Sequence, residues 1–577
     1  MTSMSLTPGP WQRRIDSRLS GWQEARFAER LWAKDPTLWS ERPVAQISDR
    51  LGWLDLPETA LAVLADVASL AREVADEGTR RIVLLGMGGS SLAPEVFHET
   101  FGSAPGYPEL IVLDSTHPDA VRAASSRVDV ARALFVVSSK SGTTLETLSF
   151  YRHFWERASR EIVGADVVGG SAPGRRFVAI TDPGTPLERL ARERAFRRVV
   201  SAPVDIGGRY SALSAFGIAP AALIGADTRR LLDAARAMAA ACGPSLQASS
   251  NPGLALGAAL AELSAAGRDK LTFVTSPALD SFPAWIEQLI AESTGKGGRG
   301  IVPVTGESLA APDTYGADRV FASIALLDED DAVREGRLAA LEAAGHPIIR
   351  FRLDERTELG GEMFRWEIAT AAAGAAMRID PFDQPDVELA KDLARQAMKA
   401  GAGGRLAAGG RAGSGAGGGA GAAGSAGASD IVRASDAAEL GRTASAWLSS
   451  ARPGDFAAIQ AYLAPSPGAA AALESIRLAL RDRLRIATTV GYGPRFLHST
   501  GQLHKGGPNS ALVLQIIDEP REDLAVPETD FSFGALIRAQ AAGDAQALAQ
   551  RGRRVLRVGV GADVAAGLAR IRSTVSQ

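Results

Sequence analysis

Residues 136–144, VVSSKSGTT, carry the strongest signal for the fold of this chain. The apolar run from Ala133 to Val137 predicts a buried strand, and the sequence from Leu145 onward predicts a helix. A loop that joins a strand to a helix offers hydroxyls and backbone N–H groups where the helix dipole favours an anion. Its five hydroxyl side chains and one lysine suit a phosphate monoester. The alternative interpretation is an ordinary helix cap after a strand.

The composition bounds the class of protein. The chain has 577 residues, a formal net charge of −3 and 46% hydrophobic residues, which predicts a globular protein of several domains and no nucleic-acid partner. Cys242 is the single cysteine, which excludes a disulfide framework and fits a reducing cytoplasm. No signal peptide is expected, and no apolar run is long enough to predict a membrane span. We therefore expect a cytoplasmic protein without membrane contact.

Strands alternate with helices from residue 81 to residue 180, and the alternation returns from residue 254. This pattern predicts α/β units with doubly wound parallel sheets, which bind ligands beyond the carboxyl ends of their strands. The expected organisation is a helical N-terminal extension at 1–50, a first α/β domain at 51–245, a second at 246–400, a flexible Gly/Ala/Ser linker at 401–429, and a C-terminal α/β segment at 430–577.

Three further segments carry candidate site residues. In MGGSSL, residues 87–92, glycines let backbone N–H groups approach a ligand and Ser90 adds a hydroxyl, although tight turns also contain glycine. Arg209 follows two glycines and suits developing negative charge on an oxygen; a surface arginine is the alternative. Glu292 stands near the end of an apolar helix and suits a general base, with a solvated helix-end glutamate as the alternative.

The last two candidate segments lie toward the C-terminus. Gln384 and Lys391 are seven residues apart, so on a helix they point to one side; ordinary surface patterning is the alternative. His498 and His504 lie in a segment rich in Gly, Ser and Lys, and imidazole suits acid–base work near neutral pH. A metal site is not expected here, because no acidic or cysteine partner is close in the sequence. A structural histidine is the alternative.

Taken together, these segments resemble the phosphoglucose isomerase family, whose sugar-isomerase (SIS) domains they match in order over about residues 50–400. The motifs that carry the resemblance are VVSSKSGTTLET, GGRYSALS, AESTGK and FDQPDVELAK. A further segment, GYGPRFLHSTGQLHKGGPN, is similar to the isomerase half of bacterial transaldolase–isomerase fusions, although no transaldolase portion is visible. The resemblance implies an α/β fold with two doubly wound parallel-sheet SIS domains, followed by the linker and the C-terminal α/β segment.

The resemblance also implies roles for single residues. The residues that match the sugar-phosphate site are Ser90, Ser139, Lys140, Ser141, Thr143 and Thr144. Those that match the catalytic and sugar-binding groups are Glu292 as the base, Arg209 beside the enediolate, Lys391 at the ring oxygen, and Gln384 as a sugar ligand. In the family, the ring-opening histidine lies between the glutamate and the lysine and comes from the partner subunit. Here LHSTGQ follows Lys391 instead, which makes His498 the candidate, delivered in cis or in trans.

The implied activity is the interconversion of glucose 6-phosphate and fructose 6-phosphate through an enediolate, without metal or organic cofactor, in a homodimer. Two alternatives stay open at this point. One is an isomerase for another phosphosugar, such as mannose 6-phosphate or an amino sugar. The other is a sugar-phosphate-sensing SIS protein, which would keep the Ser/Thr loop but would not need Glu292, Lys391 and His498 together.

Overall fold

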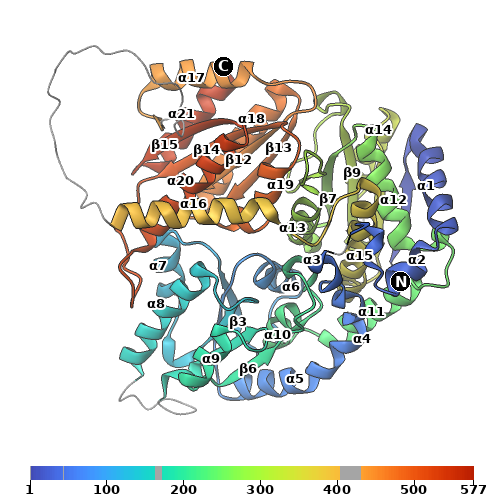
Figure 1. Cartoon of the computed structure of the whole chain (residues 1–577). Coiled ribbons are helices and arrows are strands. Elements are labelled where there is room, and N and C mark those ends of the chain that lie inside the picture. Colours follow the sequence, from blue (N-terminus) through green and yellow to red (C-terminus); the bar gives the residue numbers. More distant parts are fainter. Residues whose placement is uncertain (1, 43, 163–171, 330, 403–430) are drawn as a thin grey trace.

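The computed structural model describes residues 2–42, 44–162, 172–329, 331–402 and 431–577, so that most of the predicted linker lies outside the described residues. Three five-stranded sheets organise the described part of the chain (Figure 1). We call each sheet with its helices a unit: the first unit is blue to cyan in Figure 1, the second is mainly green, and the third is orange to red. The boundaries of the predicted domains stay predictions.

The first sheet has the strand order β3-β2-β4-β5-β6 and is parallel throughout. Its strands are β2 (Arg81–Leu85), β3 (Glu109–Leu113), β4 (Ala133–Ser138), β5 (Phe177–Thr181) and β6 (Arg198–Ser201). Successive residues of β4 face opposite cores. Phe135 joins a cluster with Phe150 and Phe154 of α8 (Leu145–Glu161), whereas Val136 joins one with Leu70 of α5 (Leu61–Asp76). Helices therefore cover both faces, and the doubly wound fold expected from the continuous apolar strands is confirmed.

The second sheet has the order β1-β10-β9-β7-β8. Its strands are β1 (Ser3–Thr7), β7 (Lys270–Thr275), β8 (Val302–Val304), β9 (Arg319–Leu326) and β10 (Ile348–Leu353). Strand β1 pairs antiparallel with β10, so the N-terminal extension is not wholly helical as predicted. The alternation Met4, Leu6 places apolar side chains against the second core, a period-2 signal that the tryptophan-rich helices after it obscured. These helices begin with α1 (Gln12–Glu24).

The third sheet has the order β11-β15-β14-β12-β13 and is parallel. Its strands are β11 (Val432–Arg433), β12 (Phe456–Tyr462), β13 (Ala487–Tyr492), β14 (Ala511–Asp518) and β15 (Arg554–Gly561). All three sheets share one arrangement. Four parallel strands lie in the order second, first, third, fourth along the chain, and a fifth strand pairs with the fourth. The chain therefore repeats one sheet architecture three times.

Helices join the third unit to the other two. The long helix α16 (Pro385–Ala402) leaves the second unit and packs along α20 (Phe533–Gln550) of the third, where Figure 1 shows it in yellow beneath the orange sheet. Helix α13 (Phe282–Thr294) of the second unit packs against the short helix α19 (Gly501–Gly506) of the third. The space between the three units holds the candidate site.

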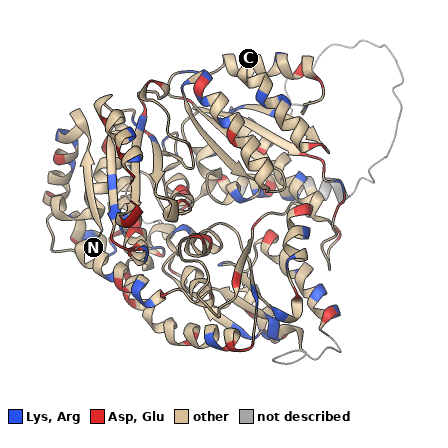
Figure 2. Cartoon of the chain, turned by 180° about the vertical axis from the view of Figure 1, so that it is seen from behind, with Lys and Arg blue, Asp and Glu red and all other residues tan. Residues whose placement is uncertain are grey.

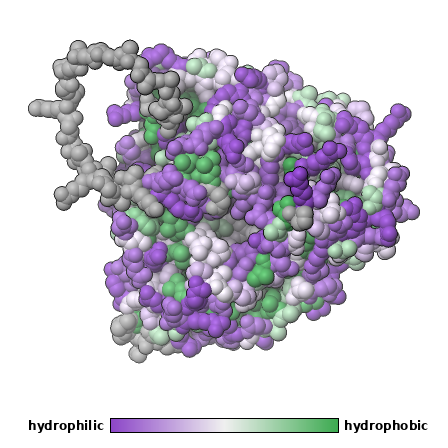
Figure 3. All heavy atoms as spheres, in the orientation of Figure 1, coloured by the Kyte–Doolittle hydropathy of each residue, from purple (hydrophilic) through white to green (hydrophobic). Residues whose placement is uncertain are grey.

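Charged and hydrophobic residues are distributed over the surface without a large patch of one kind in the views of Figure 2 and Figure 3. Lys and Arg are mixed with Asp and Glu around the outline in Figure 2, in line with the small net charge. On the face shown in Figure 3, hydrophobic residues form small separate patches among hydrophilic ones. None of the helices in the described part of the chain combines the length and apolar character that crossing a membrane requires.

Candidate active site

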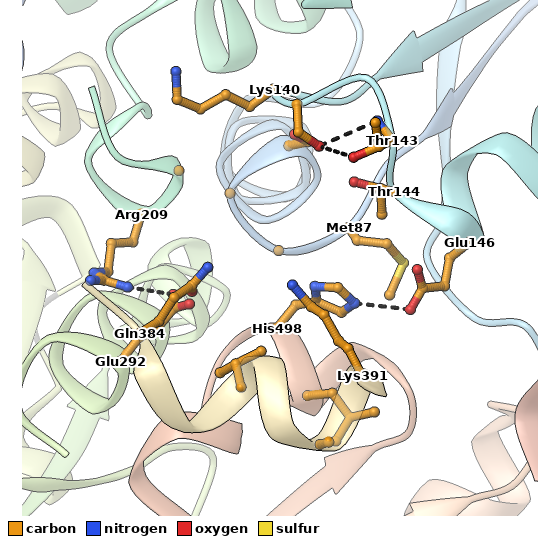
Figure 4. Close-up of a pocket in the computed structure, with 18 of the residues that line it drawn as sticks. Met87, Lys140, Thr143, Thr144, Glu146, Arg209, Glu292, Gln384, Lys391 and His498 are labelled. Atoms are coloured by element: carbon orange, nitrogen blue, oxygen red, sulfur yellow. Dashed lines mark hydrogen bonds and ion pairs between the residues drawn. The ribbon is translucent and has the colours of Figure 1, made fainter. Parts of the chain in front are cut away.

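A cavity of about 610 Å³ lies where the three units meet (Figure 4). Ten of the eleven predicted site residues line it: Ser90, Lys140, Ser141, Thr143, Thr144, Arg209, Glu292, Gln384, Lys391 and His498. They come from the loop after β2, the loop after β4, the 207–210 turn, α13, α16 with the residue just before it, and the loop after β13. The fold therefore brings together segments that lie up to about four hundred residues apart in the sequence.

The eleventh residue, Ser139, shapes the phosphate loop from behind. It is 1% exposed and does not line the cavity. Its hydroxyl oxygen lies 3.0 Å from Thr144 Oγ1 and accepts a hydrogen bond of 3.2 Å from the N–H of Gly142, whose φ is +67°. On the cavity side, Ser141 Oγ and Thr143 Oγ1 lie 2.9 Å apart. The loop thus presents Ser141, Thr143 and Thr144 at the start of α8, where the helix dipole favours a phosphate.

Lys140 is turned away from the hydroxyls of this loop in Figure 4. Its amine forms an ion pair with Asp182 and donates to the carbonyl oxygens of Pro203 and Val204, at 3.4 and 3.3 Å. Burial raises the pKa of Asp182, although the Lys140 charge opposes the rise. Lys140 therefore adds positive charge at the rim of the site and is already held by protein groups.

The glycine turn before Ser90 is pressed against the turn that carries Arg209. A Cβ atom on Gly89 would lie 2.0 Å from the carbonyl oxygen of Gly208, so only glycine permits this approach. Gly88 adopts a φ of +54°, which also favours glycine. The two turns form one wall of the cavity, and this close packing accounts for Gly89 of the first motif.

Glu292 and Arg209 form a buried pair. Glu292 Oε2 lies 3.3 Å from Arg209 Nη1, and the side chains are 7% and 5% exposed. Arg209 Nη2 also donates to the carbonyl oxygens of Pro381 and Asp383, at 3.0 and 2.7 Å. The alternatives of a surface arginine and a solvated glutamate are therefore wrong. The carboxylate and the guanidinium face one cavity, where a carbon-bound proton and a developing oxyanion can be handled side by side.

His498 lies at the other end of the cavity, beside Lys391 (Figure 4). Its Nε2 is 3.1 Å from Oε1 of Glu146, a residue that sequence reasoning missed. Burial acts to raise the pKa of Glu146, but the positive charges of His498 and Lys391 outweigh it and hold the pKa below its usual range. Glu146 stands in the first turn of α8, where an acidic residue is an ordinary helix signal, and this hid its position in the cavity.

Gln384 and Lys391 both line the cavity, but they do not share one helix as the spacing argument assumed. Gln384 lies just before α16 rather than on it, because Pro385 occupies the first helical position. Lys391 is on the second turn of α16 and points beside His498 in Figure 4. The cavity thus has a hydroxyl-rich end, a carboxylate–guanidinium pair, and a histidine–lysine end.

Residues 114–117, which follow β3 in the first unit, contact the third unit, and we call them the docking segment. Asp114 Oδ2 lies 3.0 Å from Arg495 Nη1, and Thr116 Oγ1 donates to Gln540 Oε1 at 2.8 Å. His117 accepts from the N–H of Asp119 through Nδ1, so its Nε2 carries the proton that points at Asp518, 3.0 Å away. These contacts hold the loop that carries His498 against the first unit of the same chain. Local sequence signals did not predict this contact between the units.

A metal site is not evident among the side chains described: no group of three or more His, Cys, Asp or Glu residues is placed to hold an ion. His504, the second histidine of the motif, is buried within the third unit and bonds to Gln460 Nε2 through Nδ1 at 3.1 Å. Burial lowers the pKa of His504 to about 3. It is therefore a neutral structural histidine, whereas His498 reaches the cavity.

Known proteins match this chain across the same segments. A family model described as phosphoglucose isomerase matches residues 71–312. A probable glucose-6-phosphate isomerase from Haloarcula marismortui is 30% identical over 357 residues, 56% of this chain and 78% of its own length. The glucose-6-phosphate isomerase of Rubrobacter xylanophilus is 28% identical over 437 residues, 67% of this chain and 95% of its own.

Solved structures agree with the fold. A hypothetical protein from Thermus thermophilus superposes with a TM-score of 0.57 at 26% identity, over 68% of this chain and 99% of its own. A glucose-6-phosphate isomerase from Chlamydia trachomatis superposes with a TM-score of 0.54 at 20% identity, over 69% of this chain and 88% of its own, which bears on the fold alone. With the sequence matches and the cavity between its units, this chain belongs to the phosphoglucose isomerase family.

Proposed function

We propose that this enzyme interconverts D-glucose 6-phosphate and D-fructose 6-phosphate in the cavity between its three units. The observation that carries the proposal is the buried Glu292–Arg209 pair, which faces the same cavity as the hydroxyl loop at 141–144 and the His498–Lys391 end. An aldose–ketose isomerase needs these three functions together: an anchor for the phosphate, groups that open the ring, and a base with a nearby positive charge.

The phosphate binds first, at Ser141, Thr143 and Thr144, with Ser90 beside them. Hydroxyls and the N-terminus of α8 supply hydrogen-bond donors and positive potential, and Lys140 adds charge at the rim. Ser139 belongs to this set as the residue that fixes the loop. Anchoring one end of the substrate places its reacting carbons a fixed distance away, which converts binding energy into orientation.

Ring opening takes place at the His498–Lys391 end. A proton leaves the C1 hydroxyl of the sugar and a proton reaches the ring oxygen, and His498 and Lys391 serve these transfers. Glu146 holds the imidazole through its hydrogen bond with Nε2. This contact fixes the direction in which the imidazole faces the cavity.

Proton transfer between C1 and C2 follows at Glu292. The carboxylate takes the proton from C2 of the open-chain aldose and an enediolate forms. The hydroxyl proton moves from O2 to O1, and Glu292 returns the carbon-bound proton to C1. Arg209 stabilises the negative charge on the enediolate oxygens, and its bonds to the carbonyls of Pro381 and Asp383 fix it before the reaction begins. Gln384 contacts the sugar hydroxyls.

The two competing functions differ at named features. A sugar-phosphate sensor does not need a buried carboxylate–guanidinium pair, and this favours the enzyme. An isomerase for mannose 6-phosphate or an amino sugar would use the same groups, and the names of the relatives favour glucose 6-phosphate. The homodimer and the cytoplasmic location remain proposals that follow from the family.

The test is a coupled assay of the full chain with fructose 6-phosphate, in which glucose 6-phosphate is oxidised by its dehydrogenase. Parallel reactions contain mannose 6-phosphate and glucosamine 6-phosphate at equal concentrations, with detection of the ketose product. We expect kcat/KM to be highest for the fructose 6-phosphate and glucose 6-phosphate pair. Faster turnover of mannose 6-phosphate or of the amino sugar would replace the proposed substrate, and no turnover of any of them would reject the enzyme.

A further inference from the structure

Helix α20 of the third unit presents one row of side chains to the site. Leu536, Gln540 and Asp544 are spaced four residues apart and so share a face of the helix. Leu536 and Gln540 line the cavity, and Asp544 pairs at 2.5 Å with Lys505, which also lines it. Gln540 and Asp544 are 5% and 1% exposed. The row therefore places two deeply buried polar side chains, Gln540 and Asp544, at or next to the wall of the cavity.

Gln540 connects the first unit to the ring-opening end of the cavity. Its Nε2 donates to Glu146 Oε1 at 2.7 Å, and its Oε1 accepts from Thr116 Oγ1 at 2.8 Å. The carboxylate of Glu146 only accepts hydrogen bonds, so it fixes the N–H₂ group of the amide toward itself, and the amide oxygen then accepts from the Thr116 hydroxyl. The chain of contacts runs from the docking segment through Gln540 and Glu146 to His498.

The geometry at Glu146 shows what Gln540 does. One carboxylate oxygen, Oε1, accepts from Gln540 Nε2 at 2.7 Å and faces His498 Nε2 at 3.1 Å. A buried carboxylate with a single partner can swing about its side-chain torsions, whereas a second donor on the same oxygen fixes where that oxygen lies. Since His498 takes its orientation from this oxygen, the amide of Gln540 sets the direction of the imidazole.

We propose that Gln540, with its amide held by Thr116, is a positioning residue for ring opening in this enzyme. The inference rests on the proposed function, because it assigns Gln540 to the histidine that opens the sugar ring. Gln540 acts through Glu146 and does not exchange a proton with the substrate. The third unit thus supplies both the imidazole and the amide that aims it, from two separate elements.

The test replaces Gln540 by methionine, which keeps the length of the side chain and removes the amide. The matched control is Gln546→Met, the same change at an exposed position of the same helix. We expect kcat for fructose 6-phosphate to fall about tenfold in Gln540→Met, with KM within twofold of the wild type, because the phosphate loop is untouched. Gln546→Met keeps the wild-type kcat.

A second pair of variants leaves α20 intact. Thr116→Val removes the hydroxyl that donates to the amide oxygen and should lower kcat several-fold, whereas Thr116→Ser keeps a hydroxyl and should keep kcat close to the wild-type value. The decisive readout is the double variant Gln540→Met with Glu146→Gln. If Gln540 acts through Glu146, adding Gln540→Met to Glu146→Gln lowers kcat less than twofold further.

The outcomes separate the inference from the function beneath it. A wild-type chain without isomerase activity would refute the proposed function. An active wild type in which Gln540→Met and Gln546→Met have the same kcat would overturn only the positioning role. A full tenfold loss on top of Glu146→Gln would also overturn it, since Gln540 would then act by a route that bypasses the carboxylate.

Discussion

The role of Glu292 can be tested by its isosteric amide. Glu292→Gln keeps the size of the side chain and removes the only function that a base requires, the ability to accept a proton. A positioned general base contributes about 10²- to 10⁴-fold to the rate, or ~3–5 kcal/mol of barrier. The pair with Arg209 is buried, and His498, the other acid–base candidate, lies at the other end of the cavity (Figure 4), so we expect kcat to fall at least a thousandfold.

Folding should survive the Glu292→Gln change. Stripping a buried charge of its partner costs about 3–5 kcal/mol. Arg209 keeps its bonds to the carbonyl oxygens of Pro381 and Asp383, and the new amide offers an oxygen in place of the carboxylate. We therefore expect a smaller loss of roughly 1–2 kcal/mol in the free energy of unfolding, within the reach of a urea titration.

Three measurements define the outcome for Glu292→Gln: kcat in the coupled assay, Kd for fructose 6-phosphate by calorimetry, and deuterium uptake at C2 of glucose 6-phosphate in D₂O. The Kd of Glu292→Gln for fructose 6-phosphate should stay within about fivefold of the wild-type KM, since the phosphate is held by other residues. The control is Glu367→Gln, a fully buried glutamate outside the cavity whose pKa burial raises well above its usual value. Deuterium uptake in Glu292→Gln within tenfold of the wild-type rate would refute the assignment of the base.

Three other variants test the surroundings of the site. Burial raises the pKa of Glu287 from 4.5 to about 7, so the wild-type protein loses stability as pH rises through that window. Relative to the wild type, Glu287→Gln should therefore gain about 2–3 kcal/mol in the free energy of unfolding between pH 4.5 and pH 8. Urea unfolding at both pH values measures this difference. Lys505→Met leaves the carboxylate of Asp544 buried and unpaired, and should cost about 3–5 kcal/mol in the same titration. Gly89→Ala places a Cβ 2.0 Å from the Gly208 carbonyl oxygen and should lower kcat/KM more than tenfold by forcing the two turns apart.

Each of these three has a control within the chain. Lys505→Met combined with Asp544→Asn should recover most of the lost stability, because no buried charge remains. Gly207→Ala should be tolerated, since its nearest neighbour for a Cβ is the Tyr210 ring at 3.8 Å. The Glu287 argument fails if the effect of Glu287→Gln on stability is the same at both pH values. The argument about the Lys505–Asp544 pair fails if the two substitutions have additive effects on stability. The Gly89 argument fails if Gly89→Ala and Gly207→Ala have equal activity.

Local patterns predicted the first unit well. The apolar run of β4 and the hydroxyl loop after it are adjacent in sequence, so the strand, the loop and the start of α8 follow from short-range signals. Ser139 shows the limit, because whether a loop hydroxyl faces the ligand or the loop itself depends on which way the backbone turns at Gly142.

The groups around His498 could not be predicted in this way. Glu146 and His498 are 352 residues apart, and Thr116 and Gln540 are 424 apart. Their contacts exist only because the third unit docks on the first, and that docking depends on long-range contacts with no periodicity or motif. A glutamine on an alanine-rich helix carries no sign of the carboxylate it meets.

Strand β1 was also missed because a long-range contact decides its structure. Residues 3–7 are too few for a confident periodicity, and their strand identity comes from the free edge of β10, to which they add. Edge pairing of this kind is decided by the partner strand, which lies more than three hundred residues away. Helical signals in the segment after it therefore dominated the prediction.

The docking of the third unit has a consequence for how this enzyme depends on concentration. Since the imidazole and the carboxylate base are borne by one polypeptide, specific activity should persist on dilution to levels at which any complex of two chains has come apart. For the same reason, mixing a chain that lacks the Glu292 carboxylate with one that lacks the His498 imidazole should yield no active hybrid. In each chain, its own third unit already occupies the position beside the cavity that the other chain's third unit would need.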